Sequence, residues 1–345
     1  MSVTHYQVLE VSPTASTAVI AAAHKALMKS VHPDKGIGHE EWAAQINAAF
    51  TVLGDAKARA AYDATLAYKP QDVVGDKYRI IGKIAEGGFG TTYKAEHLEL
   101  PGSLVCVKHA GKISPEYEQI LNKEARAMWD LRHHAMPAIR DYLRLPDGSV
   151  ALVMSYIEGP TLHDLVEQNG PIEPEDVAWI AERILNALLY MHSYGVVHGD
   201  LKPKNVIIQP DSHHVSVVDF GLAAIRPTAQ DGSIGYTEYF SPPEAKKGLP
   251  LLPQSDLYSL GATMLFALSA DLSAVQRRQV PTTVPDAMCD FISRMLRQHP
   301  LERPDWQQEN LMETIVSVRS TAFGRRRSGM RPIQHIRTNP APTRS

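Results

Sequence analysis

The sequence contains few cysteines and no long hydrophobic segment. Its 345 residues include only Cys106 and Cys289, and two distant cysteines support neither a disulfide framework nor a zinc site. No window approaches the roughly 20 apolar residues that a membrane helix requires. The polar residues 1–7 also lack the basic and apolar pattern of a signal sequence. These absences predict a cytoplasmic protein in a reducing compartment, with no membrane partner.

The chain also has no strong overall charge. Its formal net charge is −3, with 44% hydrophobic and 21% charged residues, which is typical of a soluble globular protein and predicts no specific nucleic-acid partner. Acidic residues are absent after Glu313, so we expect residues 317–345 to form a basic, disordered tail. Ser328 follows three arginines and is a candidate phosphorylation site, and the tail's charge alone permits contact with nucleic acid or anionic lipid. The arginines are Arg319, Arg325, Arg326, Arg327, Arg331, Arg337 and Arg344.

The chain is too long for one ordinary core and divides into two predicted domains. Residues 1–68 are alanine-rich and have apolar residues at helical spacing, and residues 69–77 are typical of a linker. From residue 78 strand signals prevail, with one helical stretch among them, and beyond residue 161 helices dominate, which predicts an α+β domain over residues 78–316. The helical runs contain Ile20, Ala23, Leu27 and Val31, then Trp42, Ile46, Ala49, Phe50 and Leu53. The predicted strands cover 78–81, 91–95, 104–107 and 150–156, and the clearest later helix covers 177–193.

A glycine-rich segment lies between the first two strand-like runs of this α+β domain. In residues 86–90, Glu-Gly-Gly-Phe-Gly, the glycines would let backbone amides approach a phosphate closely, although such a segment alone also suits an ordinary turn. Lys108 ends the next apolar run. A buried ammonium group requires an anion, and Glu124 on the following helix is the natural partner. The alternative is that Lys108 extends from the strand end into solvent.

Two carboxylates follow in short, polar segments. Residues 198–205 read His-Gly-Asp-Leu-Lys-Pro-Lys-Asn, and residues 219–221 read Asp-Phe-Gly after an apolar run. Phosphoryl transfer requires a group that orients the attacking hydroxyl, a cation near the transferred phosphate and oxygen ligands for magnesium. These two segments contain all three kinds of group.

The order of these motifs, followed by Pro-Pro-Glu at 242–244, resembles the protein kinase family over roughly residues 78–316. The resemblance implies a bilobal fold and the use of ATP with Mg²⁺ or Mn²⁺. It implies that Asp200 is the catalytic base and that Lys202 neutralises the γ-phosphate, while Asn205 and Asp219 bind the metal. Lys108 would hold the α- and β-phosphates. The other implied ATP-site residues are Ala85, Gly87, Gly88, Phe89, Gly90, Thr92, Cys106, Glu124, Met154 at the gatekeeper position and Tyr156 in the hinge.

Further residues have structural counterparts in that family. The resemblance implies a buried ion pair between Glu244 and Arg303, and it implies that Asp256 braces the catalytic loop. Lys202 and Thr237 together indicate serine/threonine specificity. Protein substrates are therefore the expected partners.

Four positions depart from the family pattern. Ala85 replaces the first glycine of the phosphate loop, and Thr92 and Cys106 replace residues of similar size beside the adenine. Gly199 replaces the arginine that, in many kinases, pairs with a phosphorylated activation segment. We therefore expect activity to depend little on phosphorylation of that segment.

The N-terminal residues resemble a second family. Residues 4–67 have the helix pattern of a DnaJ-type J domain, with His32, Pro33 and Asp34 between two helices and Arg-Ala-Ala-Tyr-Asp at 59–63. The resemblance implies a small all-α domain whose His-Pro-Asp tripeptide contacts a DnaK-type chaperone and stimulates its ATPase. The usual basic docking face is reduced to Lys25, Lys29 and Lys35, so the alternative is an interaction or dimerisation module.

Two functional interpretations follow. The first is an active protein kinase that acts with, or on, chaperones and their clients. The second is a co-chaperone or scaffold whose kinase fold mainly binds partners. The intact Asp200, Lys202, Asn205 and Asp219 favour the first and argue against a pseudokinase. His-Gly-Asp-Leu with Asn205 also occurs in small-molecule kinases of the aminoglycoside and choline type, but Lys202 and the intact Asp-Phe-Gly argue against them. The sequence predicts neither the substrate nor the oligomeric state.

Overall fold

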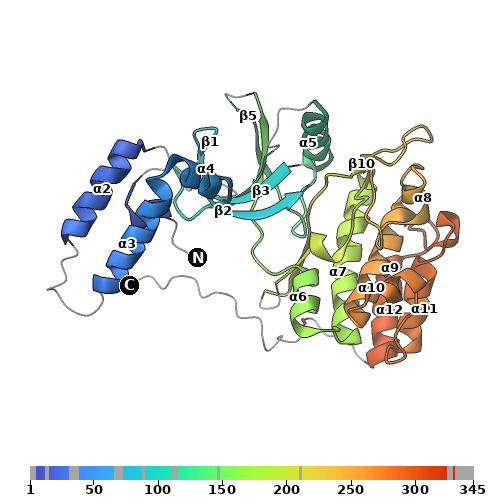
Figure 1. Cartoon of the computed structure of the whole chain (residues 1–345). Helices are drawn as coiled ribbons and strands as arrows, with labels where there is room; N and C mark the ends of the chain where they lie inside the picture. The colour runs from blue at the N-terminus through green and yellow to red at the C-terminus, as the bar shows by residue number, and fades with distance from the viewer. Residues whose placement is uncertain are drawn as a thin grey trace. The chain divides into compact units, whose positions relative to one another are not determined.

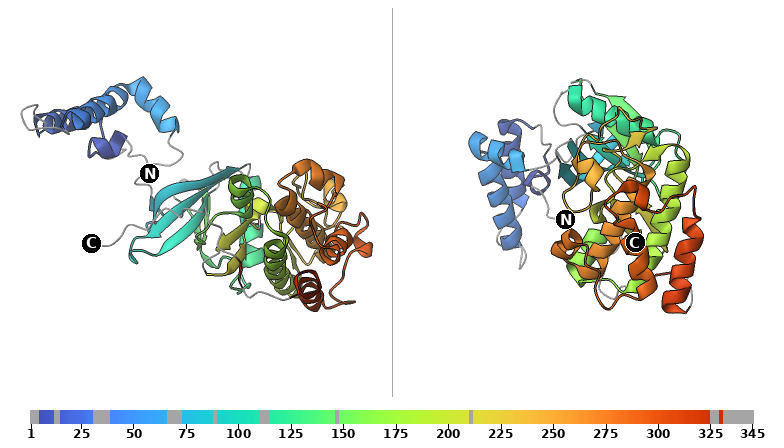
Figure 2. Two further views of the ribbon diagram at one scale, coloured as in Figure 1. Left: turned by 90° about the horizontal axis from the view of Figure 1, so that it is seen from below. Right: turned by 90° about the vertical axis from the view of Figure 1, so that its right-hand side faces the viewer.

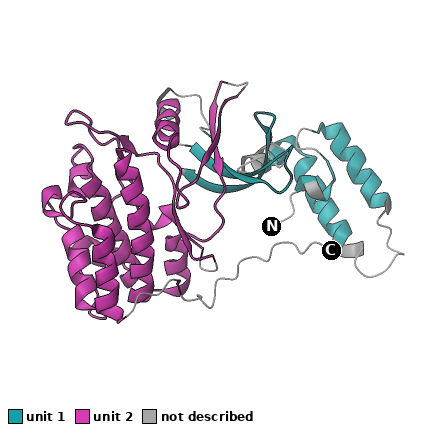
Figure 3. Cartoon of the chain, turned by 180° about the vertical axis from the view of Figure 1, so that it is seen from behind, with its two compact units in different colours: residues 1–109 teal, residues 110–345 magenta. Residues whose placement is uncertain are grey.

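The computed structural model forms two compact units, Met1–His109 and Ala110–Ser345 (Figure 3). It describes residues 5–11, 15–30, 39–65, 73–87, 90–109, 115–145, 148–209, 212–324 and 329–330. An α+β protein with a helical N-terminal part is therefore confirmed. In the described part of the chain, no helix is long and apolar enough to cross a membrane.

The first unit begins with a group of helices around a small apolar core (Figure 1). Tyr6, Leu9, Ile20, Ile46 and Leu53 are at most 1% exposed and pack together, as expected for apolar residues at helical spacing. The tripeptide residues His32, Pro33 and Asp34 lie outside the described residues. The helices are α1 His5–Val8, α2 Thr17–Ser30, α3 His39–Leu53 and α4 Ala56–Thr65.

Polar contacts hold α4 against the start of this unit. The Arg59 guanidinium donates to the Tyr6 hydroxyl at 3.0 Å and to the Ala15 carbonyl at 2.9 Å, and the backbone N–H of His5 donates to the Tyr62 hydroxyl at 3.0 Å. Arg59 and Tyr62 therefore stabilise the packing of α4 against the first residues of this unit. Trp42, which the helical spacing assigned to the apolar face, is 37% exposed, because residues on α3 one turn away already fill that core.

The second part of this unit is an antiparallel sheet (Figure 2). The three predicted strands are longer than their apolar runs, because the pairing continues past the C-terminal end of each run, and in β3 past both ends. The register places Ala85 opposite Thr92, and Thr92 opposite Lys108. Three of the candidate ATP-site residues are thus neighbours across the strands. The strands are β1 Val73–Val74, β2 Tyr78–Gly87, β3 Gly90–His97 and β4 Leu104–His109.

The second unit combines short strands with a mainly helical part. Helix α5 Pro115–Met128 precedes the hairpin β5 Ile139–Arg144 and β6 Val150–Ser155. Strand β5 was not predicted, because its polar residues give no apolar run. The other strands are β7 Val196–Val197, β8 Val206–Gln209, β9 His214–Val217 and β10 Ala224–Ile225, and β7 pairs with β10 and β8 with β9.

Two long helices, α7 Pro174–Ser193 and α9 Pro253–Ser269, lie at the centre of the core of this unit and contribute more to it than any other element. All residues of α9 from Gln254 to Leu268 are buried, so this helix is covered on every side. It provides a rigid support for the loops that precede it. The other helices are α6 Leu162–Asn169, α8 Pro243–Lys246, α10 Leu272–Arg277, α11 Asp286–Met295 and α12 Leu311–Phe323, with the 3₁₀ turns Pro203–Asn205 and Pro300–Glu302.

The last helix, α12, continues past the predicted start of the tail at residue 317. Val318 and Phe323 pack against the core, and Arg319 is 1% exposed and forms an ion pair with Glu182 on α7. The helix ends at Gly324, whose positive φ of 69° suits glycine. The predicted boundary thus falls inside α12, because the first arginine of the basic segment is a core residue.

The Arg319–Glu182 pair gives a stability prediction. Arg319→Met removes the cationic partner of the buried Glu182 carboxylate, so we expect a loss of about 3–5 kcal/mol in the free energy of unfolding. Replacing both residues, Arg319→Met with Glu182→Leu, should restore most of it. Calorimetric unfolding of the full chain measures both effects.

The matched control is Arg294→Met, which breaks an exposed pair with Glu309 and should change the unfolding temperature little. An Arg319→Met protein that unfolds at the wild-type temperature would contradict the assigned role of the buried pair.

Candidate functional site

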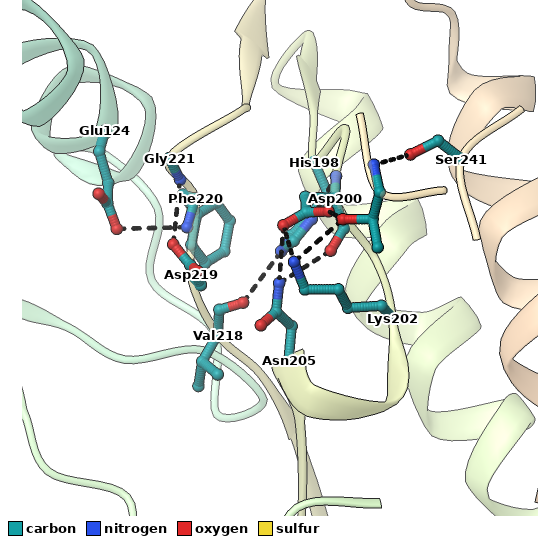
Figure 4. Close-up of polar contacts among 11 residues, drawn as sticks. Glu124, His198, Asp200, Lys202, Asn205, Val218, Asp219, Phe220, Gly221 and Ser241 are labelled. Atoms are coloured by element: carbon teal, nitrogen blue, oxygen red, sulfur yellow. Dashed lines mark hydrogen bonds and ion pairs between the residues drawn. The ribbon is translucent and has the colours of Figure 1, made fainter. Parts of the chain in front are cut away.

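The candidate site is built on the loop between β7 and β8. Asp200 lies at its centre, and its carboxylate accepts hydrogen bonds from the side chains of Lys202, Thr237 and Asn205 (Figure 4). The Lys202 ammonium lies 2.6 Å from Asp200 Oδ2, and the Thr237 hydroxyl donates to Asp200 Oδ1 at 2.6 Å. Lys202 also donates to the Thr237 hydroxyl at 3.1 Å. The side chains of Asp200, Lys202 and Thr237 form a closed triangle that fixes the carboxylate.

Asn205 closes the same loop from the other side. Its Nδ2 donates to the Asp200 carbonyl at 2.9 Å and to Asp200 Oδ2 at 3.2 Å. Because both bonds use the amide nitrogen, the amide oxygen is the atom available to a cation. Asn205 sits in the 3₁₀ turn that leads into β8 and is 5% exposed.

Asp219 follows β9 and has an unusual backbone. Its φ of 66° is in the left-handed region, which is uncommon for residues other than glycine. This turn directs the carboxylate away from the strand, and Gly221 N lies 3.4 Å from its Oδ1. Asn205 and Asp219 offer hard oxygen ligands, and among the described residues no cluster of three or more His, Cys, Asp or Glu could hold a metal. Two protein ligands completed by phosphate and water suit Mg²⁺.

His198 connects the Asp200 loop to the Asp219 segment. Its Nδ1 accepts from the Asp200 backbone N–H at 3.2 Å, and its Nε2 lies 3.2 Å from the Val218 carbonyl. An amide N–H can only donate and a carbonyl can only accept, so the ring carries its proton on Nε2. The ring is fully buried beside Phe220, with centroids 4.9 Å apart.

Asp256 on α9 anchors the catalytic loop through hydrogen bonds to its backbone. Its carboxylate accepts from the backbone N–H groups of His198 and Gly199 at 2.8 and 2.9 Å, and from His192 Nε2 at 2.8 Å. Burial raises the pKa of this carboxyl, but the hydrogen bonds from His192 and Gly199 outweigh burial, so the pKa lies below its ordinary value. The predicted bracing contact is confirmed.

Gly199 occupies a position that only glycine suits. Its φ is 77°, and a Cβ there would lie 2.6 Å from the Leu222 carbonyl oxygen and 2.8 Å from Leu251 Cδ1. The local backbone thus explains why this loop has glycine. No side chain at 199 is available to receive a phosphate from the activation segment.

A second buried contact anchors the activation segment. Arg303 binds both carboxylate oxygens of Glu244, at 2.6 and 2.8 Å, and the Ser255 hydroxyl donates to the same carboxylate at 2.8 Å. Burial raises the pKa of Glu244, but the bonds and charge of Arg303 lower it further, to below its ordinary value. The predicted ion pair is confirmed.

The remaining candidate residues are placed within their own units. Glu124 is buried on α5 and accepts from the Phe220 backbone N–H at 3.3 Å, whereas Lys108 belongs to the first unit, so their pairing stays a prediction.

Gly87 pairs with Gly90 across β2 and β3, while Gly88 and Phe89 lie outside the described residues. Cys106 is half-buried on β4 opposite Lys94. Met154 is buried near the end of β6, and Tyr156 is half-buried just after it.

One contributor was missed by the sequence analysis. His192, in the last turn of α7, contacts Asp256 but is part of no motif considered. Its only sequence signal is a second histidine six residues before His198. The contact depends on where α7 ends relative to α9, and a local pattern does not contain that information.

Two family models match the chain. The protein kinase domain matches residues 78–313, well over half of the chain, and the DnaJ domain matches residues 4–63. The first of these families uses ATP and a divalent metal.

Similar curated proteins are bacterial kinases. The serine/threonine-protein kinase pkn3 of Myxococcus xanthus is 31% identical over 66% of this chain and 47% of its own length. PkaA of Streptomyces coelicolor is 31% identical over 71% of this chain and 50% of its own length, and PknL of Mycobacterium tuberculosis is 35% identical over 55% and 48%. The chain thus spans about half the length of these relatives. The motifs, the geometry and these similarities show that the chain belongs to the protein kinase family and carries a DnaJ domain before the kinase domain.

Proposed function

We propose that the chain transfers the γ-phosphoryl group of ATP to serine or threonine hydroxyls of protein substrates. The observation that supports this most directly is the triangle of Asp200, Lys202 and Thr237, with Asn205 bonded to the same carboxylate. Phosphoryl transfer depends mainly on positioning and charge stabilisation. A carboxylate held by three neighbours is positioned in advance of substrate binding.

Each side chain has a proposed task. Asp200 accepts a hydrogen bond from the substrate hydroxyl and takes its proton as the oxygen attacks phosphorus. Lys202, already beside Asp200, neutralises charge on the transferred phosphoryl group. The Thr237 hydroxyl, which now donates to Asp200, marks the place where a substrate hydroxyl would donate. This juxtaposition favours a serine or threonine acceptor.

Asn205 and Asp219 are the proposed ligands of Mg²⁺ or Mn²⁺. The bound metal would neutralise the phosphate oxygens of ATP. Lys108 and the backbone of Gly87 and Gly90 would contact the phosphates, and Met154 and Tyr156 the adenine. Ala85, Gly88, Phe89, Thr92, Cys106 and Glu124 complete the proposed nucleotide site.

We propose that the DnaJ domain couples the kinase to a DnaK-type chaperone through His32, Pro33 and Asp34. The helices that flank this tripeptide form a packed core, and Arg59 and Tyr62 hold α4 in place. Such a domain could bring the kinase to chaperones or to their clients. The second candidate, a scaffold that uses the kinase fold for binding, has less support, because the contacts around Asp200 are those that catalysis requires.

The first prediction concerns chemistry. Asp200→Asn removes the proton acceptor and should reduce phosphoryl transfer by about 10²–10⁴-fold. The intact mass of the purified chain after incubation with ATP and Mg²⁺ measures added phosphates, and a general protein substrate extends the test to other acceptors. ATP binding should persist in the variant. Equal phosphate incorporation by wild type and Asp200→Asn would refute the proposed role.

The second prediction concerns the activation segment. Thr237→Ala removes the hydroxyl that bonds Asp200 and Lys202, so we expect about a tenfold loss of rate. Ser233→Ala and Thr228→Ala should stay within about twofold of wild type, because the loop offers no arginine at Gly199 to receive a phosphate. Initial rates of phosphorylation compare the three. A large loss at Ser233 would sink the idea of phosphorylation-independent activity.

The third prediction concerns the chaperone. The wild-type chain should stimulate ATP hydrolysis by a DnaK-type chaperone, and His32→Gln should abolish this stimulation. Steady-state phosphate release measures both. The Asp200→Asn chain is the control and should stimulate normally, because its DnaJ domain is unchanged. If the wild type gives no stimulation, the DnaJ domain serves another purpose.

A further inference from the structure

A chain of hydrogen bonds leads from the loop after the Pro300–Glu302 turn to the catalytic loop. The indole Nε1–H of Trp306 donates to His192 Nδ1 at 2.8 Å, and His192 Nε2 lies 2.8 Å from Asp256 Oδ2. Asp256 in turn accepts the backbone N–H groups of His198 and Gly199. Trp306 is thus three contacts away from the backbone of the catalytic loop at His198 and Gly199, while lying far from it in sequence.

The chemistry of Trp306 determines the protonation of His192. An indole N–H can donate but cannot accept, so His192 Nδ1 must carry a lone pair. The ring proton of the neutral imidazole is then on Nε2, where it points to the Asp256 carboxylate. The His192 side chain is 4% exposed and Asp256 is fully buried, so solvent offers little replacement for a lost bond.

Removal of the indole N–H would leave two neutral tautomers open to His192. In one of them the proton moves to Nδ1, and the Nε2 lone pair then faces the Asp256 carboxylate. Two acceptors in contact repel each other, and a buried acceptor without a donor is unfavourable. Addition of a second proton would restore the Nε2–H bond to Asp256.

The other charged groups near this chain are engaged elsewhere. His198 also faces Asp256, but its ring bonds the Asp200 N–H and the Val218 carbonyl. On the Trp306 loop, Arg303 binds Glu244, and Asp305 accepts from Gln254 Nε2 at 3.2 Å. His192 and Asp256 are therefore the pair whose protonation Trp306 controls.

We propose that Trp306 is a positioning residue for the catalytic loop, which it stabilises by holding His192 as the neutral Nε2–H tautomer that bonds Asp256. The catalytic consequence rests on the proposed kinase function, whereas the tautomer does not. Trp306 contacts neither the hydroxyl acceptor nor the phosphates and acts only through His192 and Asp256.

The tautomer is tested first, on the full-length wild-type chain. Nitrogen-resolved NMR of the imidazole rings, with His192 assigned by comparison with a His192→Gln variant, reports which nitrogen carries the proton. At about pH 8 we expect a proton on Nε2 and none on Nδ1. A proton on Nδ1 at this pH overturns the proposal, whether or not any Trp306 variant folds.

The catalytic consequence is tested with Trp306→Phe, which removes the N–H and keeps an aromatic ring. At about pH 8 we expect kcat for phosphorylation to fall about three- to tenfold, with little change in KM for ATP. A general disruption of the fold would impair KM and kcat together, whereas a positioning role in the catalytic loop changes kcat alone.

The matched control is Trp129→Phe, the same change at a side chain that is 56% exposed at the end of α5. It should match wild type in both kcat and KM. Wild-type kcat in Trp306→Phe overturns the proposal. If the wild type itself phosphorylates nothing, the kinase function fails, and the NMR result alone decides the proposed tautomer.

Discussion

The buried carboxylate of Asp256 is the contact on which the geometry of the site depends. Residues 198–202 form neither helix nor strand, so their backbone N–H groups lack the partners that regular structure provides. Asp256 supplies two of those partners from the most deeply buried helix of the unit. The charge in the interior is tolerated because donors surround it. The ionised carboxylate of Asp256 therefore holds the loop in place, and the N–H groups of the loop in turn stabilise the charge on Asp256.

The start of α9 serves two loops at once. Asp256 bonds the catalytic loop, while Ser255, its neighbour, bonds Glu244 of the activation segment. Arg303 binds the same Glu244 carboxylate and also donates to the Gln254 carbonyl at 3.0 Å. One rigid helix end thus fixes both the carboxylate that would take the proton and the segment that would hold the substrate, so errors in their relative position are kept small.

The parts of the site that were predictable are those with short sequence separation or a strong family pattern. Asp200, Lys202 and Asn205 lie within six residues, and their contacts follow from one loop. His192 and Trp306 are 114 positions apart, and only the packing of the helices brings them together. Strand β5 was missed because its faces are polar, and the end of α12 because an arginine was taken as a solvent residue although Glu182 neutralises it in the core. In each case tertiary packing overrode a local pattern.

The close fit around Gly199 has a consequence for how such a chain can change over time. A kinase that lost its arginine on an open loop could regain phosphate control through one substitution. Here an arginine at 199 would require a left-handed backbone and the displacement of the Leu222 carbonyl and of Leu251. The loop and its neighbours would have to change together. Control of this chain is therefore expected to evolve through its location and its binding partners, and a fused DnaJ domain is suited to provide both.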